Sequence, residues 1–249
     1  MGIILIRFSG DNINKILNKE IDFGIAQSDL VYRKKGIKVV MALHSELLAL
    51  VVRKGSGIRS FYQILHRKIN IGKSNSGTYK AVVTLLSHSK RVKLGYFIHY
   101  NFDVSKAPFY LHKKKIDGYF YMVGHPAKNI KEAANLDSID LISFYKVKAA
   151  RELVKKYPYY AWGVIPSGTY KGVNHPTITY GLKALLITTS NMSEEVVYKL
   201  TKAILDNFDE FKKSLPQFKN LTKRDLLKGF DLKMLHPGAK RAFIEDGIL

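Results

Sequence analysis

Short apolar runs alternate with amphipathic segments along the chain, and this alternation is typical of an α/β protein. Runs rich in β-branched and large apolar residues predict strands over 3–8, 22–26, 38–43, 47–53, 68–72, 116–122, 139–144, 159–165 and 177–188. Apolar residues three and four positions apart predict helices over 11–19, 60–66, 77–89, 105–115, 127–135, 146–156, 191–211, 221–230 and 237–246. Strands that alternate with helices in this way are expected to pair mostly in parallel.

The chain shows no internal repeat and no long linker, so its division must follow local breaks in the pattern. Such breaks lie near Gly55 and within 166–176. We therefore expect one lobe made of 1–55 together with 176–249, and a second lobe over 56–175. In the first lobe, Asn191 followed three residues later by Glu194 predicts a capping box at a helix start.

Composition excludes several classes of protein. The 249 residues are 46% hydrophobic and 12% aromatic, enough for a packed core and unlike a disordered chain. The absence of cysteine excludes disulfides, thiol catalysis and Cys-ligated metal sites. No apolar run approaches the ~20 residues that span a bilayer. Residues 1–9 hold an apolar run of only three or four residues and do not match a secretory signal.

The net charge of +21 predicts attraction to polyanions, but it comes mainly from scattered lysines. The tightest groups are 113–115 and the pairs at 34–35, 155–156 and 212–213. Base reading and bidentate phosphate binding usually depend on arginine. We therefore interpret the charge chiefly as a solvated, lysine-rich surface, and expect no nucleic-acid partner.

The most informative stretch is 68–83, where a predicted strand ends in a small polar loop and a helix begins at once. The first amides of a helix have no partner within it, and its dipole makes that end electropositive. Asn75, Ser76, Gly77 and Thr78 are thus expected to present N–H groups and hydroxyls to a carboxylate or phosphate. The competing interpretation is ordinary helix capping. Gly72 and Gly77 have the spacing of a P-loop, but Thr78 stands where its lysine belongs, which excludes an NTPase.

Two other strand ends carry candidate chemistry. Gln27 and Ser28 follow the strand over 22–26, at the edge where open α/β sheets place ligands. Gly124 and His125 follow the strand over 116–122, although a lone histidine before proline is more often structural than catalytic. The aromatic run 157–162 is expected to belong to the core or to the wall of a small-molecule cleft. The histidines have no spacing suited to a metal, so no metal or cofactor is expected.

Ordered segments along nearly the whole chain resemble the TAXI-type solute-binding proteins of tripartite (TRAP) transporters, often labelled immunogenic proteins. These segments are DNINKILNKEIDFGIAQSD at 11–29, LALVVRKGSGIRS at 48–60, INIGKSNSGT at 69–78, KKIDGYFYMVGHPA at 114–127, YPYYAWGVIPSGTYKG at 157–172, TYGLKALLIT at 179–188, VYKLTKAILDNFDEF at 197–211 and LHPGAKRAFIEDGIL at 235–249. Each motif is moderately specific, and their conserved order and spacing make the series much more so.

The resemblance implies a type II periplasmic-binding-protein fold, in which two α/β lobes close on a small solute and deliver it to a membrane permease. Glutamate, glutamine or dicarboxylates are the usual solutes of the family. The resemblance implies a periplasmic, monomeric receptor with no catalytic residues. The ligand-binding residues that it implies are Asn12, Gln27 and Ser28 from one lobe and Asn75, Ser76, Gly77, Thr78, Tyr121, Gly124 and His125 from the other.

The chain departs from the family at its beginning. Family members begin with a signal peptide, a strand and a Gly-rich turn that leads into a helix, whereas this sequence is expected to start about one strand–helix unit later. Two other functions stay open from the residues alone. One is an effector-sensing or nucleic-acid-associated module of the same fold, and the other is an acid–base enzyme built around His125.

Overall fold

The computed structural model describes residues 9–32 and 34–249, so the strand expected over 3–8 lies outside the described residues. The chain divides into two compact units. Unit 1 comprises residues 1–45 and 182–249, and unit 2 comprises residues 46–181. Within the described part of the chain, no helix has both the length and the apolar character needed to cross a membrane.

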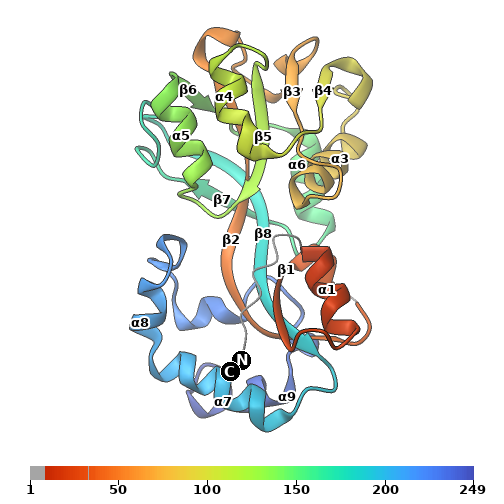
Figure 1. The fold of residues 1–249 in the computed structure, drawn as a ribbon, viewed down its shortest axis with the longest axis vertical. Coiled ribbons are helices and arrows are strands. Elements are labelled where there is room, and N and C mark those ends of the chain that lie inside the picture. Colours follow the sequence, from red (N-terminus) through yellow and green to blue (C-terminus); the bar gives the residue numbers. More distant parts are fainter. Residues whose placement is uncertain (1–8, 33) are drawn as a thin grey trace. The chain divides into compact units, whose positions relative to one another are not determined.

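Most of the predicted elements are present (Figure 1), but strand β4 (Ile98–Tyr100) is not predicted, and the helices predicted over 60–66 and 221–230 are 3₁₀ turns over Phe61–Ile64 and Lys223–Leu227. The strands are β1 (Phe23–Gln27), β2 (Ile37–Arg53), β3 (Lys68–Asn70), β4 (Ile98–Tyr100), β5 (Gly118–Val123), β6 (Ile139–Leu141), β7 (Ala161–Ile165) and β8 (Thr177–Thr189). The helices are α1 (Ser9–Leu17), α2 (Ser28–Val31), α3 (Gly77–His88), α4 (Ala107–His112), α5 (Lys128–Leu136), α6 (Lys148–Lys156), α7 (Glu194–Asp206), α8 (Phe208–Lys213) and α9 (Pro237–Glu245).

The expectation of a mostly parallel sheet is wrong. Strand β2 pairs antiparallel with β5 and β6, and β8 pairs antiparallel with β1 and β7. Strand β3 pairs in parallel with β4 and with β5. These strands are separated along the chain by α3 and α4, and a parallel pair requires such a crossover. The alternation of elements identifies strands, but it does not report their direction.

One strand, β2, is much longer than the local pattern suggests. The sequence predicts separate strands over 38–43 and 47–53, but β2 continues without a break through His44, Ser45 and Glu46. The boundary between the units falls inside β2, and a second boundary falls inside β8 between Gly181 and Leu182. The two units are thus joined by continuous strands.

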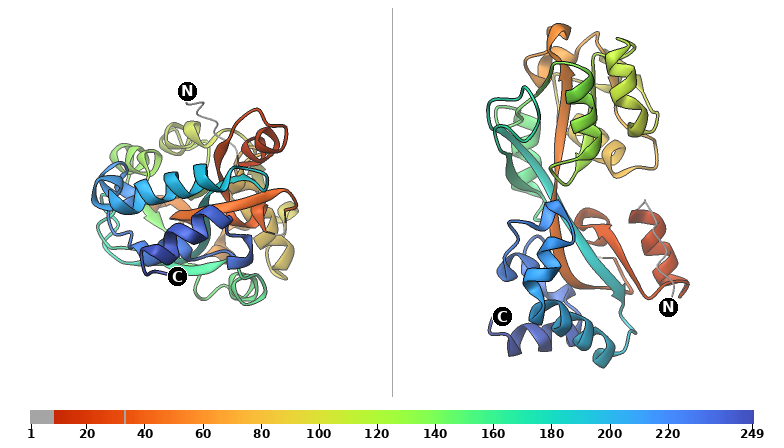
Figure 2. Two further views of the ribbon diagram at one scale, coloured as in Figure 1. Left: turned by 90° about the horizontal axis from the view of Figure 1, so that it is seen from below. Right: turned by 60° about the vertical axis from the view of Figure 1, so that its left-hand side comes forward.

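Unit 2 contains a sheet in which β2, β5, β3 and β4 are neighbours in that order. Helices α4 and α5 lie side by side on one face (Figure 2) and bury Ala107, Leu111, Ile130 and Ala133 in a core with β5. Helices α3 and α6 pack against each other. The buried residues of α3 recur at one- and three-residue steps (Ala81, Val82, Leu85 and Leu86), the spacing of an amphipathic helix.

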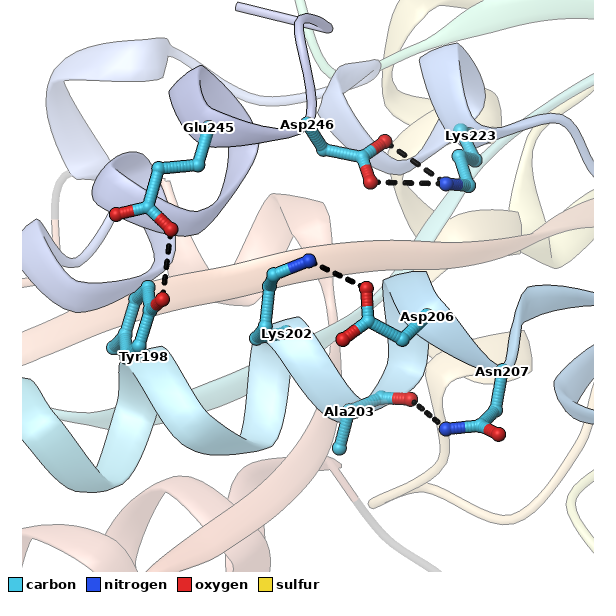
Figure 3. A network of polar contacts seen from close by, with 8 residues as sticks. All are labelled: Tyr198, Lys202, Ala203, Asp206, Asn207, Lys223, Glu245 and Asp246. Carbon is cyan, nitrogen blue, oxygen red and sulfur yellow. Dashed lines mark hydrogen bonds and ion pairs between the residues drawn. The ribbon is translucent and has the colours of Figure 1, made fainter.

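In unit 1, β1 pairs with residues 184–188 of β8, and α1 packs against β1. Helices α7 and α9 pack against each other, and Val197, Ala239, Ala242 and Phe243 are fully buried in their core. Ion pairs lie on the surface of this region (Figure 3). Lys202 pairs with Asp206 within α7, and Lys223 of a 3₁₀ turn pairs with Asp246 at the end of α9.

The capping box expected at Asn191 and Glu194 is wrong. Ser193 is the N-cap residue of α7, and no side chain caps it. A reciprocal capping box does occur in unit 1, between Thr222 and Asp225 of a 3₁₀ turn.

Candidate functional site

The beginning of α3 carries the first group of predicted ligand-binding residues. The hydroxyl of Ser76 caps the helix by accepting a hydrogen bond from the Tyr79 N–H at 3.2 Å. The N–H groups of Gly77 and Thr78 stand in the first turn, where the helix itself supplies no carbonyl partner. Asn75 is exposed, and Ser76 and Gly77 are half-buried. Ser76 therefore caps the helix, as the competing interpretation expects, and anion binding by the amides of Gly77 and Thr78 stays a prediction.

Three hydrogen bonds hold this helix start and the loop before it in place. The Thr78 hydroxyl accepts a hydrogen bond from the Met122 N–H of β5 at 3.1 Å, and Thr78 is only 5% exposed. The Asn70 side-chain oxygen accepts from the N–H of Gly72 at 3.4 Å and of Phe102 at 3.2 Å. Thr78 is therefore a positioning residue, because its side chain joins the beginning of α3 to β5.

Gly72 is required by the same loop. Its φ of +88° is a left-handed conformation that favours glycine, and a Cβ there would lie 3.0 Å from the Ser76 hydroxyl. This glycine lets the chain turn from β3 toward the cap of α3.

His125, just after β5, is engaged at both ring nitrogens. Nε2 lies 3.3 Å from the Leu47 carbonyl, and Nδ1 lies 2.5 Å from the Tyr170 hydroxyl. Because a carbonyl only accepts, Nε2 carries the proton, and the Tyr170 O–H donates to Nδ1. The Tyr170 oxygen in turn accepts from the Ala127 N–H at 2.9 Å.

This network keeps the imidazole neutral. Burial lowers the pKa of His125 to about 4, against the opposing effect of its hydrogen bond to Leu47. Burial also raises the pKa of Tyr170, so its phenol stays protonated and able to donate. At neutral pH the ring has no free nitrogen with which to take a proton from a substrate. The geometry favours a structural role for His125, which fixes the loop that carries Gly124.

Tyr121 lies on β5 and is half-buried, whereas Gly124 is buried. The structure connects β5 to the beginning of α3 through the contact between Met122 and Thr78. Thus two separate predictions, the helix start at 75–78 and the strand end at 121–125, fall on neighbouring elements of unit 2.

The candidates of unit 1 are buried and hydrogen-bonded to the main chain. The Asn12 amide donates to the Ile25 carbonyl at 2.7 Å, which ties α1 to β1. The Ser28 hydroxyl accepts from the Lys183 N–H at 3.3 Å, and Gln27 pairs in register with Ala184. The Asn12 side chain thus ties α1 to β1, and the Ser28 side chain ties the residue after β1 to β8.

Lys183 is a charged group that the sequence analysis missed. It interrupts the apolar strand TITYGLKALLIT and lies next to Ser28, and within the described residues its ammonium forms no ion pair. Burial lowers the pKa of Lys183, and the charge of Asp225 opposes this. Burial, and secondarily the charge of Lys183, lowers the pKa of His44 to about 4. The signal in the sequence was a single lysine within an otherwise apolar strand, because lysine is almost never fully buried unless its charge is paired.

No three His, Asp or Glu side chains of the described part of the chain gather closely enough to hold a metal ion.

Two of the solved structures with similar folds are periplasmic sulfonate-binding proteins. The sulfonate-binding protein SsuA from Methylobacillus flagellatus KT matches with a TM-score of 0.54 and 16% identity, over 96% of this chain and 80% of that chain. The aliphatic sulphonate binding protein SsuA from Escherichia coli matches with a TM-score of 0.53 and 8% identity, over 96% of this chain and 67% of that chain. These likenesses confirm the expected fold class, a mixed α/β protein of the bilobed periplasmic-binding type.

A third similar structure is described under glutathione import in Gram-positive bacteria via GshT and the cystine ABC importer TcyBC of Streptococcus mutans. Its TM-score is 0.53 at 15% identity, over 89% of this chain and 81% of that chain. At such low identities, these structures are similar to this chain in fold. A model of the NMT1-like family matches the sequence from residue 6 to residue 247, which is nearly the whole chain. The chain therefore belongs to the NMT1-like family.

Proposed function

We propose that this protein is an extracytoplasmic solute-binding receptor that holds a small organic anion and passes it to a membrane permease. The observation that carries the proposal is the beginning of α3, a twelve-residue helix whose first turn holds the N–H groups of Gly77 and Thr78. Backbone amides aligned with a helix dipole bind carboxylates, phosphates and sulfonates through the same interaction. Such amides can hold an anion without any catalytic side chain.

Unit 1 supplies a second cationic feature that suits the same class of ligand. Lys183 is half-buried beside Ser28 and carries a charge that burial disfavours. An anionic ligand near Lys183 would stabilise the ammonium, because an opposite charge favours the charged form.

The solute is proposed to be a glutamate-, glutamine- or dicarboxylate-like molecule, from the resemblance to the TAXI-type proteins. That resemblance also supports a TRAP-type permease as the partner and a periplasmic location. The names of the similar structures support the wider class, since sulfonate is an anion. The carboxylate and the sulfonate are therefore the two head groups to compare.

An enzyme built around His125 is disfavoured by the hydrogen bonds of its ring to Tyr170 and Leu47. A nucleic-acid-associated module would need a recognition element for a groove, and the described helices provide no helix-turn-helix candidate outside the α/β units.

The proposal is tested by thermal unfolding of the full chain in the presence of glutamate, glutamine, dicarboxylates and aliphatic sulfonates, followed by calorimetric titration of any hit. A ligand at 100 times its Kd stabilises a protein by about 2.7 kcal/mol, which a thermal scan detects readily. We expect one anion of the panel to raise the melting temperature. A panel without any shift overturns the proposal.

Matched variants then locate the site. Gly77→Asp places a negative charge in the first turn of α3, which favours the helix but repels an anion. The same substitution at Gly95, where a side chain meets no atom within 4 Å, is the control. Lys183→Met, with the exposed Lys240→Met as control, tests unit 1. We expect Gly77→Asp to abolish the thermal shift and Gly95→Asp to retain it; retention by Gly77→Asp refutes the role of α3. For unit 1 taken by itself, a loss of the shift in Lys183→Met but not in Lys240→Met would support a role of Lys183 in binding.

A further inference from the structure

The positive charge is distributed unevenly between the units. Unit 2 holds 22 of the 41 Lys and Arg residues but only 7 of the 20 acidic residues, a net charge of +15, against +6 for unit 1. Within unit 2, residues 90–115 contain seven Lys and Arg and a single acid, Asp103. The Asp103 carboxylate accepts a hydrogen bond from the Ser105 N–H at 2.9 Å. The basic surface of this segment is thus almost free of compensating carboxylates.

The same segment exposes large apolar side chains. Tyr96 and Ile98 are 53% and 51% exposed, and Phe109 on α4 is 51% exposed. Strand β4 is the outermost strand of its sheet (Figure 1), and all three of its residues are exposed. Ile98 and Tyr100 are two residues apart on β4, so they point to the same face.

Ring contacts connect β4 to α4 into one continuous surface. Tyr100 contacts Phe102 at a centroid distance of 6.1 Å, and Phe102 contacts Tyr110 at 4.9 Å. Tyr110 contacts Phe109 at 6.0 Å. The exposed face of β4 and the exposed face of α4 are therefore parts of one aromatic surface.

Lysines frame these rings. The Lys113 ammonium lies 5.8 Å from the centroid of Phe109, and the Lys115 ammonium lies 5.1 Å from that of Tyr110. Lys106, Phe109, Tyr110 and Lys113 follow the three- and four-residue spacing that brings side chains onto one face of a helix. We name this surface the aromatic–lysine surface; it comprises Tyr96, Ile98, Tyr100, Lys106, Phe109, Tyr110, Lys113 and Lys115.

We propose that the aromatic–lysine surface docks unit 2 on an anionic phospholipid bilayer. Aromatic rings prefer the headgroup level of a membrane, and lysines beside them reach the anionic headgroups. Charge complementarity favours this occupant, because residues 90–115 hold seven Lys and Arg and one acid, and the Asp137 carboxylate beside α4 lies 3.3 Å from His112. A protein partner fits less well, since lysine is depleted in protein–protein interfaces. The inference goes beyond solute binding and does not depend on it.

The first test is sedimentation of the full chain with vesicles of phosphatidylcholine, with and without phosphatidylglycerol. We expect binding only to the anionic vesicles and weaker binding as salt is raised. Each lysine near an anionic surface contributes about fivefold to partitioning, so Lys113→Gln with Lys115→Gln lowers it about 25-fold. Lys34→Gln with Lys35→Gln, a pair of exposed lysines in unit 1, removes the same charge and is expected to change it far less.

The second test separates bilayer docking from simple attraction to a polyanion. Phe109→Ser leaves the net charge unchanged and is expected to weaken vesicle binding roughly tenfold, because it removes the apolar anchor. Leu232→Ser, which changes an exposed leucine of unit 1, is the control. The proposal is overturned if anionic vesicles are not bound, if both lysine pairs act equally, or if Phe109→Ser binds like the wild type while DNA competes fully.

Discussion

Replacing Tyr170 with phenylalanine tests the hydrogen-bond network that fixes the loop after β5. The Tyr170 oxygen accepts from the Ala127 N–H, and its proton goes to His125 Nδ1. Tyr170 is only 2% exposed, and it belongs to the core that α4 and α5 form with β5. Phenylalanine keeps the ring and its packing, so the substitution removes only the hydroxyl.

The expected loss follows from the two partners that the hydroxyl leaves behind. The Ala127 N–H is buried and would lose its acceptor, which costs about 1–3 kcal/mol. Loss of the hydrogen bond to His125 adds about 1 kcal/mol. Because the ring stays in place, no large cavity term is added. We expect Tyr170→Phe to lower the free energy of unfolding by about 2–4 kcal/mol.

Urea unfolding of the wild type and variant measures this difference, and Tyr145→Phe is the matched control. Tyr145 is 52% exposed, so its variant is expected to stay within about 0.5 kcal/mol of the wild type. NMR titration of the imidazole provides an independent readout. Without the phenol donating to Nδ1, the neutral ring loses a partner, so the pKa of His125 should rise, although the burial that chiefly lowers it to about 4 remains. Equal stabilities for the two variants, with an unchanged pKa, would refute the network.

Two further predictions concern pH and helix packing. His44 and His125 have pKa values of about 4 in the folded protein, against 6.5 ordinarily. The unfolded chain therefore binds protons first as pH falls, and stability should drop between about pH 6.5 and pH 4, by about 2 kcal/mol per histidine from pH 7 to pH 5; urea midpoints that do not change over this range would contradict it. At Gly238 in α9, a Cβ would overlap the Glu194 carbonyl oxygen of α7, so Gly238→Ala should destabilise by about 1–3 kcal/mol in urea unfolding, whereas Gly95→Ala should be near neutral.

Local rules carried the prediction of α3 and its approach. The polar loop, the serine at the cap and the apolar spacing that follows are all features of neighbouring residues, and the structure begins α3 at Gly77 as expected. Such features need no information from distant parts of the chain, because a cap satisfies amides within its own first turn. The anion-binding potential of Gly77 and Thr78 could be inferred for the same reason.

Non-local contacts decided what the sequence analysis missed. The polar triplet His44, Ser45 and Glu46 looks like a break between strands, yet β2 continues through it. The antiparallel pairs of β1 with β8 and of β2 with β5 join strands that lie far apart in sequence, so their direction has no local signature.

The sequence alone determined the class of protein: α/β elements, a polar helix start after β3, and a lysine-rich composition without cysteine. Only the tertiary structure shows the hydrogen bond of the Thr78 hydroxyl to Met122 and the hydrogen bonds of the His125 ring to Tyr170 and Leu47. It places Lys183 beside Ser28. It also gathered dispersed aromatic and basic residues into one surface on β4 and α4. The physical reason is that helix caps and amphipathic spacing depend on residues a few positions apart, whereas burial, pairing direction and charge environment depend on segments that meet only when the chain folds.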